Sequence, residues 1–365
     1  MSEDPLTTLI PLIKMGNLGW GSVNFNKVEY IEQSLINDSF LLKKGDFLFN
    51  TRNTPDLVGK SAVWDEDYTA TFDNNINRIV FNKKVYTNFI AYYLNTGKGK
   101  SAIQSLPAGS TSVAAIYWKD LKNIQLLLPS LGEQQKIVQI LSTWDKAISV
   151  TEKLLTNSQQ QKKALMQQLL TGKKRLLDEN GVRFIKKWEK TTLGDIAKIT
   201  TGSSNRQDSS LDGKYTFFDR SEDIRTSSIY LFDGEAIIVP GEGQRFEPKY
   251  FIGKFDLHQR TYAIMDFASH SGRFLFYMID YLKVYFLNQA VGSTVKSLRL
   301  PMFQKMTFEA PEIEEQQKIA AVLSAADAEI STLEKKLACL KGEKKALMQQ
   351  LLTGKRRVVV DVDAA

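Results

Sequence analysis

Cysteine and histidine are scarce in this chain, which limits the chemistry that its side chains can support. Among 365 residues there is one cysteine, Cys339, and there are two histidines, His258 and His270. A single cysteine cannot form an internal disulfide, so we expect a reducing, cytoplasmic environment. A zinc site needs several cysteine or histidine ligands, so the sequence predicts no metal centre.

Long apolar runs are also missing. No stretch approaches the roughly 18–20 apolar residues that a membrane-spanning helix needs. Residues 1–8 contain Glu3 and Asp4 and no basic cluster, so they do not have the pattern of a secretory signal peptide. We therefore expect a protein that has no membrane partner.

The motifs of common nucleotide-dependent and methyl-transferring enzymes are absent. A phosphate-binding P-loop has the pattern Gly-x-x-x-x-Gly-Lys-Ser/Thr. The chain contains two Gly-Lys-Ser sequences, but Leu94 in one and Thr54 in the other stand where the first glycine is needed. The chain contains no Pro-Pro pair, so it lacks the Asn/Asp-Pro-Pro-aromatic motif of DNA methyltransferases. We expect a protein that is not an enzyme, with no catalytic residue and no cofactor in this chain.

Basic residues are in excess. The chain has 48 Lys and Arg against 41 Asp and Glu, a formal net charge of +7. A positive balance favours a polyanionic partner, and nucleic acid is the usual one. Charge alone also fits a protein that is merely basic, so the organisation of the chain has to decide between the two.

Two segments of the chain match each other without a gap. Residues 129–175 and residues 311–357 align with an offset of 311 − 129 = 182 throughout. More than half of the aligned positions are identical, and both segments contain EQQKI and KKALMQQLLTGK. The chain is therefore a tandem duplication, in which a variable domain precedes each copy of a shared segment.

Each shared segment has the signals of one long helix. Pro129 and Pro311 stand just before the first turn, where a proline does not interrupt a helix. Glu133 and Glu315 fall in that turn, and their charge suits the positive end of the helix dipole. The sequence predicts a helix that begins near each of these glutamates.

A glycine, Gly172 or Gly354, ends each predicted helix after its last apolar pair. Basic residues surround these glycines at 173–175 and 355–357. They either complement the negative end of the helix dipole or contact DNA phosphates, and we favour the first interpretation.

Apolar positions recur in alternating steps of four and three residues along both segments, which is the spacing of a coiled-coil seam. We expect the two helices to pack antiparallel on each other within one chain, with Trp144 opposite the smaller Ala326. At 1.5 Å per residue each helix would be roughly 55–60 Å long, a length that suits a spacer between the two variable domains. The alternative is that the helices form a stalk through which two chains dimerise. The seam and partner-binding residues are Ile137, Leu141, Trp144, Ile148, Leu155, Leu165, Leu169, Ile319, Leu323, Ile330, Leu337, Leu347 and Leu351.

The shared segments divide the chain into a first variable domain at 1–128, a central helix at 129–175, a second variable domain at 176–310, a distal helix at 311–357 and a tail at 358–365. Short runs of β-branched and aromatic residues predict α+β domains with twisted β-sheets. The two domains repeat a few local patterns. The paired patterns are the strands FLFNT and AIIVP after a Gly-acid pair, the aromatic stretches FIAYYL and FLFYMI, the turns at 109–111 and 292–294, and the closing strands IQLLL at 124–128 and MTFEA at 306–310.

These motifs together resemble the specificity subunits of type I restriction–modification systems. The resemblance rests on the Pro-x-x-x-EQQKI entries, the ALMQQLLTGK helix ends, the Gly-Ser-Thr turns and the opening WEKTTLGDIAKITTG of the second domain at 188–202. It covers nearly the whole chain. The combination is specific, whereas any one of these elements alone would be weak.

The resemblance implies a function and a set of partners. Such subunits carry two target-recognition domains, each of which reads one half of a split, asymmetric site on double-stranded DNA. Their helices bind two methyltransferase subunits, which carry S-adenosylmethionine and methylate adenine. Restriction and translocase subunits join in systems that also cleave DNA, and the specificity subunit itself catalyses nothing.

The first domain departs from this pattern. It has no counterpart of the opening at 188–202, and residues 9–21 align loosely with 213–224, so about 20 residues of domain opening are missing. A truncated product, a misassigned start and an opening supplied by another polypeptide all remain open. If the product is truncated, the alternative is a subunit that reads one half-site and acts as a dimer.

Polar and basic loop residues are the candidates for DNA contact, because base edges and phosphates are read by Arg, Lys, Asn, Gln, Ser and Thr. For each of them an ordinary solvated loop is the alternative. The candidates in the first domain are Asn17, Trp20, Arg52, Asn53, Ser110, Thr111 and Ser112. In the second domain they are Arg206, Gln207, Arg220, Ser221, Arg225, Gln244, Arg245, Ser293, Thr294 and Lys296.

Two other functions are compatible with parts of this pattern. A stand-alone nuclease or DNA-modifying enzyme with an unfamiliar site predicts metal-dependent cleavage by the purified chain. A purely structural coiled-coil adaptor predicts no DNA binding. The duplication and the missing catalytic motifs favour the DNA-reading subunit, whose target sequence cannot be read from the residues because loop conformation and DNA shape decide it.

Overall fold

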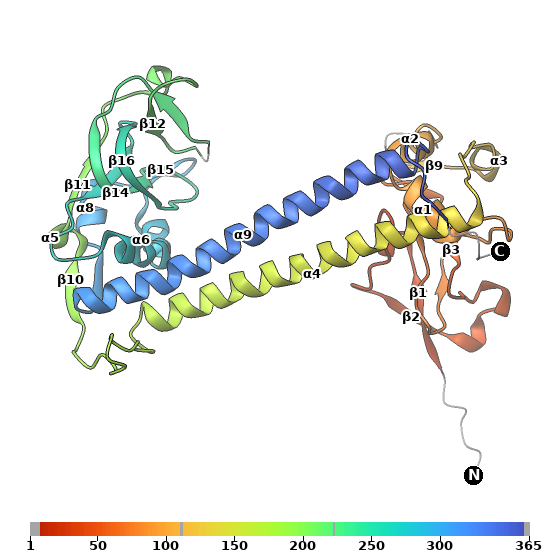
Figure 1. The fold of residues 1–365 in the computed structure, drawn as a ribbon, viewed down its shortest axis with the longest axis horizontal. Helices are drawn as coiled ribbons and strands as arrows, with labels where there is room; N and C mark the ends of the chain where they lie inside the picture. The colour runs from red at the N-terminus through yellow and green to blue at the C-terminus, as the bar shows by residue number, and fades with distance from the viewer. Residues whose placement is uncertain (1–7, 110–111, 222, 361–365) are drawn as a thin grey trace, which may run out of the picture. The chain divides into compact units, whose positions relative to one another are not determined.

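The computed structural model describes residues 8–109, 112–221 and 223–360. The chain divides into two compact units, of which unit 1 comprises residues 1–151 and 336–365 and unit 2 comprises residues 152–335. Helices α4 (Leu131–Leu169) and α9 (Ile313–Leu351) have 39 residues each (Figure 1). Each helix contributes one part to unit 1 and the other part to unit 2. Both predicted long helices are confirmed.

The two helices run antiparallel within each unit. In unit 1, Glu133 near the start of α4 binds Arg357 just after α9, and Asp145 further along α4 binds the earlier residue Lys344. Residue numbers therefore rise along α4 as they fall along α9. Unit 2 repeats this arrangement, so the predicted antiparallel coiled coil is confirmed.

The expected contact between Trp144 and Ala326 is wrong. Asp145 of α4 pairs with Lys344 of α9, so the adjacent Trp144 lies opposite the part of α9 around Lys344. Asp327 of α9 pairs with Lys162 of α4, so the adjacent Ala326 lies opposite the part of α4 around Lys162. The periodicity of a helix fixes which face is apolar, but it does not fix which residue of the partner lies opposite.

The seam residues are most deeply buried toward the ends of each helix, where a variable domain also packs on them. Ile137, Leu141, Leu169, Ile319, Leu323 and Leu351 are at most 4% exposed. The remaining members are partly buried, namely Trp144, Ile148, Leu155, Leu165, Ile330, Leu337 and Leu347. Polar Thr151 and Ser158 occupy buried positions between them.

Unit 2 contains a six-stranded mixed sheet that is covered by helices. The strand order is β11-β17-β14-β16-β12-β13. Helix α6 packs against β14 and β16 and lies beside the first turns of α9 (Figure 1). The bounds are β11 Lys198–Thr201, β12 Tyr215–Phe218, β13 Arg225–Ser227, β14 Phe232–Pro240, β16 Lys249–Leu257, β17 Thr261–Met265, α6 Gly272–Tyr281, α7 Lys283–Gln289 and α8 Leu300–Gln304.

Two short strands close unit 2. Strand β10 (Glu189–Thr192) pairs antiparallel with β19 (Thr307–Ala310), which leads directly into α9. The short helix α5 (Leu193–Ile196) follows β10 and contacts α8. The opening of this domain thus lies beside its closing strand.

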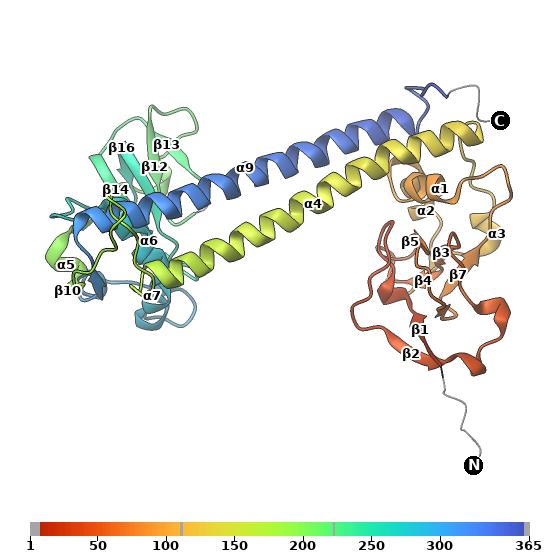
Figure 2. The same ribbon diagram turned by 60° about the horizontal axis from the view of Figure 1, so that its bottom comes forward.

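Unit 1 repeats the frame with shorter strands. Strand β1 pairs antiparallel with β2 and parallel with β6. In unit 2, β12 likewise pairs antiparallel with β13 and parallel with β16. Strand β3 pairs antiparallel with both β5 and β7, as β14 does with β16 and β17. Helix α1 lies beside α4 (Figure 2). The bounds are β1 Leu9–Ile13, β2 Glu29–Glu32, β3 Phe47–Asn50, β5 Ser61–Val63, β6 Thr71–Phe72, β7 Ile76–Ile79, α1 Thr87–Leu94, α2 Gly97–Gln104 and α3 Trp118–Leu121.

The expected strand at 124–128 is wrong. Residues 124–128 carry no strand, whereas the equivalent segment of unit 2 forms β19. The difference has a physical cause, because β19 is paired by β10 and the described part of unit 1 contains no counterpart of β10. A strand without a partner leaves its backbone N–H and C=O groups unpaired.

The predicted α+β architecture, with two variable domains and an antiparallel helix pair, is confirmed. Across residues 8–109, 112–221 and 223–360, no helix is both long and apolar enough to cross a membrane. In the same ranges no three His, Cys, Asp or Glu side chains gather in an arrangement that would hold a metal ion.

Candidate nucleic-acid interface

Three arginines of unit 2 line one polar cavity of about 310 Å³. They come from a turn before β12, from the loop after β12 and from the turn between β16 and β17, so the fold gathers residues that are far apart in sequence. The lining residues are Arg206, Asp219, Arg220, Glu242, His258, Gln259 and Arg260. Of these, Arg206 and Arg220 were predicted from the sequence.

Buried Asp219 organises one side of this cavity. Its carboxylate accepts a hydrogen bond from the backbone N–H of Ser221 at 2.7 Å and lies 3.5 Å from a guanidinium nitrogen of Arg206. Arg206 also donates to the hydroxyl of Ser221 at 3.1 Å. The Arg206 side chain is 55% exposed, so it is oriented by these contacts and still open to a ligand.

Glu242 organises the other side. Its carboxylate accepts a hydrogen bond from Arg260 at 2.7 Å and lies 3.8 Å from Arg220. Both arginine side chains are more than half exposed. Three guanidinium groups thus face two carboxylates, and planar guanidinium groups suit bidentate binding of phosphate oxygens or of guanine.

His258 lies between these charges, and burial, the largest influence on it, lowers the pKa of its imidazole. Arg260 and Arg220 lower this pKa further, and Asp219 opposes them. The ring nitrogen Nδ1 accepts a hydrogen bond from the backbone N–H of Arg260 at 3.1 Å. In the neutral ring Nε2 therefore carries the proton, which makes it a hydrogen-bond donor.

A second pair of predicted loops is brought together by a short strand pairing. Strand β15 (Glu242–Gly243) pairs antiparallel with β18 (Lys296–Ser297), so that Gly243 lies opposite Lys296. The loop that carries Gln244 and Arg245 therefore adjoins the turn that carries Ser293 and Thr294. These four loop residues and Lys296 are all exposed.

The same pairing recurs in unit 1. Strand β4 (Arg52–Asn53) pairs antiparallel with β9 (Ala114–Ala115), which also pairs with β8 (Ala108–Gly109). Arg52 is exposed, and so is Ser112 in the turn between β8 and β9. Ser110 and Thr111 of that turn lie outside the described residues.

Several predicted residues have structural contacts that occupy their polar groups. Asn17 is 6% exposed, and its side chain bonds to the backbone of Lys14 and Asn24. The amide of Asn53 donates to Asn50. These contacts leave Asn17 little room for DNA, and we do not include it in the surface proposed below.

The remaining predicted residues are exposed or half-buried. The ammonium group of Lys100 stands 4.0 Å from the centre of the half-buried Trp20 ring. Gln207 is exposed beside Arg206. Arg225 begins β13 and is half-buried.

Sequence reasoning missed Arg260, Gln259 and the position of His258. These residues form the turn between β16 and β17, two strands whose pattern was not recognised. The signal was present, because the polar sequence HQR at 258–260 separates two runs rich in aromatic and apolar residues. Such a break predicts a turn.

Buried residues of the repeated motif hold each variable domain on the helix pair. The side chain of Gln316 donates to the Pro311 carbonyl at 2.7 Å and accepts from the backbone N–H of Ser271, the residue before α6, at 3.0 Å. In unit 1, Gln134 makes the same contacts with Pro129 at 2.9 Å and with Tyr86, the residue before α1, at 2.8 Å.

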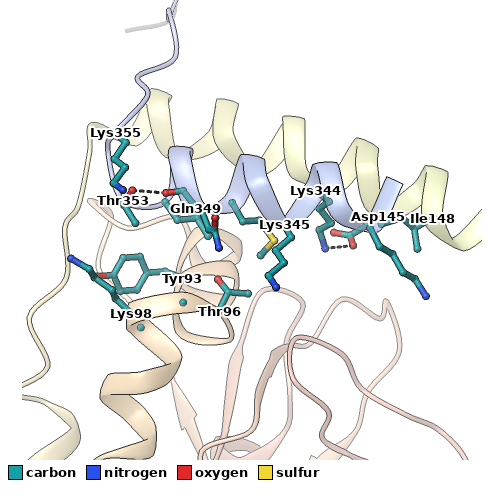
Figure 3. Close-up of a pocket in the computed structure, with 15 residues that line it drawn as sticks. Tyr93, Thr96, Lys98, Asp145, Ile148, Lys344, Lys345, Gln349, Thr353 and Lys355 are labelled. Atoms are coloured by element: carbon teal, nitrogen blue, oxygen red, sulfur yellow. Dashed lines mark hydrogen bonds and ion pairs between the residues drawn. The ribbon is translucent and has the colours of Figure 1, made fainter. Parts of the chain in front are cut away.

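A tyrosine, an aspartate and a lysine add a second anchor in each unit. In unit 1 the hydroxyl of Tyr92 on α1 donates to Asp145 at 2.5 Å. Lys344 of α9 binds the same carboxylate (Figure 3). In unit 2 the corresponding residues are Tyr277, which donates to Asp327 at 2.6 Å, and Lys162, which is 2.5 Å from it.

A larger cavity of about 810 Å³ lies in unit 1 between the start of α2 and the last turns of α9. Figure 3 shows Tyr93 and Lys98 on one side of it and Lys345 and Lys355 on the other. Five lysines line this cavity, together with the apolar side chains of Ile148, Met348 and Leu352.

Comparison with known proteins decides the family. Residues 10–157 and 185–341 match the family described as type I restriction modification DNA specificity domain. The chain belongs to this family. It contains two copies of the domain, as the resemblance drawn from its motifs predicted.

Individual relatives agree with this assignment. The chain is 25% identical to the putative type I restriction enzyme MjaX specificity subunit of Methanocaldococcus jannaschii, over 95% of this chain and 87% of that protein. It is 27% identical to the type I restriction enzyme EcoDI specificity subunit of Escherichia coli, over 46% of this chain and 37% of that protein. Its fold is similar to that of the type I restriction–modification S subunit from M. genitalium, with a TM-score of 0.67, 15% identity, and coverage of 96% and 91%.

Proposed function

We propose that this chain reads a split, asymmetric site on double-stranded DNA, one half with each variable domain, and that it docks two methyltransferase subunits. One observation carries the proposal: both units keep the same buried anchors, while the loops around β4 and β15 differ in sequence. A frame that is kept while its loops diverge fits a reader of two different sequences.

The arginine cavity of unit 2 supports the DNA-reading part. Arg206, Arg220 and Arg260 are each more than half exposed and are each oriented by a carboxylate. An oriented guanidinium group loses less conformational freedom when it binds than a free one does. We assign this cavity, together with the adjoining loop at Gln244 and Arg245, to the half-site of unit 2.

The repeated helices support the docking part. Lys163, Gln167 and Gln168 of α4 are identical to their counterparts in α9, and all are exposed. Packing within the chain does not require identity at exposed positions. Two equal surfaces are expected if two copies of one partner bind, and the lysine-lined cavity of unit 1 adjoins one of these surfaces.

The proposal assigns the chemistry to the partners. The methyltransferase subunits would hold S-adenosylmethionine and methylate adenine, and restriction or translocase subunits would join where the system also cleaves. This chain would supply sequence recognition and assembly from within the cytoplasm. The purified chain by itself is expected neither to methylate nor to cleave DNA.

The test is to co-express the chain with a candidate methyltransferase subunit and to map methylated adenines across the genome. Two different half-sites with a fixed gap support the proposal. Metal-dependent cleavage by the purified chain alone would replace it with a nuclease function. A stable complex that neither binds DNA nor methylates it would point to a structural adaptor.

A second candidate is a subunit that reads with unit 2 alone and acts as a dimer. It is favoured by one observation, the missing counterpart of β10 and α5 in the described part of unit 1. This candidate predicts a palindromic methylation motif in the same experiment, because two copies of one half-site would then be read in opposite orientations.

A further inference from the structure

The cavity between the start of α2 and the last turns of α9 carries more positive charge than its own carboxylate can balance. Its lining contains five lysines and one acidic residue, Asp145, and every lining residue belongs to unit 1. The carboxylate of Asp145 already binds Lys344 and accepts the hydroxyl of Tyr92. This cavity is called the lysine cavity below.

Three of its lysines have no acidic partner. Within the residues that the structure describes, no ion pair joins Lys98, Lys345 or Lys355 to a carboxylate, and all three side chains are exposed. Lys98 comes from α2, whereas the other two come from α9 and the residues just after it, across the cavity (Figure 3). Like charges that face one cavity repel each other, and a bound anion would remove this repulsion.

The corresponding lysine of unit 2 is neutralised. Counted from the tyrosine that anchors each unit, at an offset of 277 − 92 = 185, Lys98 corresponds to Lys283. Lys283 pairs with Asp280 at 3.0 Å. The counterpart of Asp280 is Asn95, whose amide donates to two backbone carbonyls. Unit 1 therefore has an uncharged amide where unit 2 has the neutralising carboxylate.

Two glycines leave the cavity open. The same offset places Gly97 and Gly99 at the positions of Leu282 and Val284. Gly99 can carry no side chain, because its Cβ would lie 2.1 Å from the carbonyl oxygen of Tyr93. Gly99 is buried and lines the cavity, and its backbone N–H has no hydrogen-bond partner among the described residues. A buried peptide N–H without a partner is rare, so this donor suits an anion in the cavity.

The charge and the size of the cavity both suit phosphate. A phosphate monoester carries a charge of about −1.5 to −2 and three acceptor oxygens, so one group can bind several lysines at once. A carboxylate is planar and suits the fork of an arginine, and no arginine is among the residues that line this cavity. The volume of about 810 Å³ lies in the range of small-molecule sites, about 300–1,000 Å³.

We propose that the lysine cavity binds phosphate groups, with Lys98, Lys345 and Lys355 as charge partners and the N–H of Gly99 as a donor. The groups come either from a free oligophosphate, such as a nucleoside triphosphate, or from the backbone of DNA. Neither source requires the chain to read a sequence, so the inference does not rest on the proposed function.

Calorimetric titration of the full chain with inorganic tripolyphosphate, at constant ionic strength, tests this inference. We expect one tripolyphosphate to bind per chain and to slow backbone hydrogen exchange at 97–100. Lys345→Gln should weaken the binding about tenfold, the effect of losing one hydrogen bond between charged groups. Lys345→Arg keeps the charge and should retain most of the binding.

The repeat supplies a matched control. Lys163 is the counterpart of Lys345, stands in the same sequence KKALMQQ and is also exposed. Both glutamine variants change an exposed residue, so both should fold normally. Lys163→Gln should leave tripolyphosphate binding unchanged, because unit 2 has Leu282 and Val284 in place of the two glycines and neutralises Lys283.

A short duplex of arbitrary sequence distinguishes the two sources of phosphate. If DNA supplies the groups, Lys345→Gln weakens duplex binding and tripolyphosphate competes with the duplex. If a free oligophosphate supplies them, the variant weakens the binding of tripolyphosphate alone. Both results support a phosphate site.

Three results would overturn the inference. Neither probe binds, or Lys345→Gln and Lys163→Gln weaken binding equally, which indicates unspecific attraction to a basic chain. In the third, a poly-glutamate peptide binds to the lysine cavity more tightly than tripolyphosphate, which makes the cavity a site for an acidic protein segment.

Discussion

The fully buried carboxylate of Glu315 accepts two hydrogen bonds from the guanidinium group of Arg175, at 2.7 Å and 2.6 Å. The Arg175 side chain is only 18% exposed. Because a buried charge that loses its partner is costly, we expect Glu315→Gln to lower the free energy of unfolding of unit 2 by about 3 kcal/mol. Urea unfolding, followed by hydrogen exchange in β19, measures this loss.

The same pair in unit 1 supplies the comparison. Arg357 binds Glu133 in the same bidentate way, but the Arg357 side chain is 71% exposed and water can solvate it when the partner is lost. Glu133→Gln should therefore cost clearly less than Glu315→Gln. Glu314→Gln at an exposed neighbouring position should be neutral, and equal losses from all three variants would refute this explanation.

The Glu133 pair should also make unit 1 sensitive to acid. The hydrogen bond from Arg357 lowers the pKa of Glu133, against the opposing effect of burial. A lowered carboxyl pKa contributes stability that is complete above the usual value of 4.5 and is lost as the pH falls through the lowered value. The difference in stability between the wild type and Glu133→Gln should therefore be constant near neutral pH and shrink in acid; a difference that grows in acid would contradict the pairing.

Sequence reasoning reached the repeat and both long helices because helix periodicity and end signals are local, and it reached the antiparallel pairing because a whole domain separates the two helices along the chain. It failed where the outcome depends on a distant partner. Residues 124–128 are apolar enough for a strand, yet a strand forms only where β10 supplies hydrogen bonds, as it does for β19. The Trp144–Ala326 contact failed for the same reason, since register depends on both helices.

The candidate interface divides in the same way. Loop composition was enough to find Arg206, Arg220 and the Gln244–Arg245 loop, which are polar stretches beside glycine or serine. It could not show that Arg260 joins Arg220 through Glu242, because that contact forms only when β15 and the turn after β16 meet. The basic residues after each helix were expected to complement the helix dipole; Arg175 and Arg357 in addition bind buried glutamates.

The tyrosine anchors should contribute to stability in both units. Tyr277 is 1% exposed, and its hydroxyl donates to Asp327; burial raises the pKa of Tyr277, so it stays a donor at any ordinary pH. Tyr277→Phe should lower the free energy of unfolding by about 1 kcal/mol, the usual net value of one hydrogen bond. Thermal unfolding measures it, with the 43% exposed Tyr230→Phe as the control that should show no change.

The two histidines offer a direct test of the arginine cavity. Burial lowers the pKa of His258 from its usual 6.5, so its imidazole should stay neutral at pH 7. A proton NMR titration should show one of the two histidine signals with a midpoint below 6.5, and that signal should disappear in His258→Gln. A His258 midpoint above 6.5 would mean that the carboxylates of Asp219 and Glu242 outweigh burial and the arginines.

Loss of one arginine of the cavity should affect one half-site alone. Arg260→Ala removes a guanidinium group that Glu242 holds at 2.7 Å, and Arg245→Ala removes one from the adjoining loop. If either contacts a base, recognition should weaken by about 1–3 kcal/mol at one position of the unit 2 half-site. If it contacts a phosphate, affinity should fall for all sequences, and the slope of log affinity against log salt should decrease by about 1.

Arg183→Ala, at an exposed position between α4 and β10, is the matched control. Binding to sites that are mutated in one half at a time separates these outcomes, and an equal loss at both half-sites would remove these arginines from the interface.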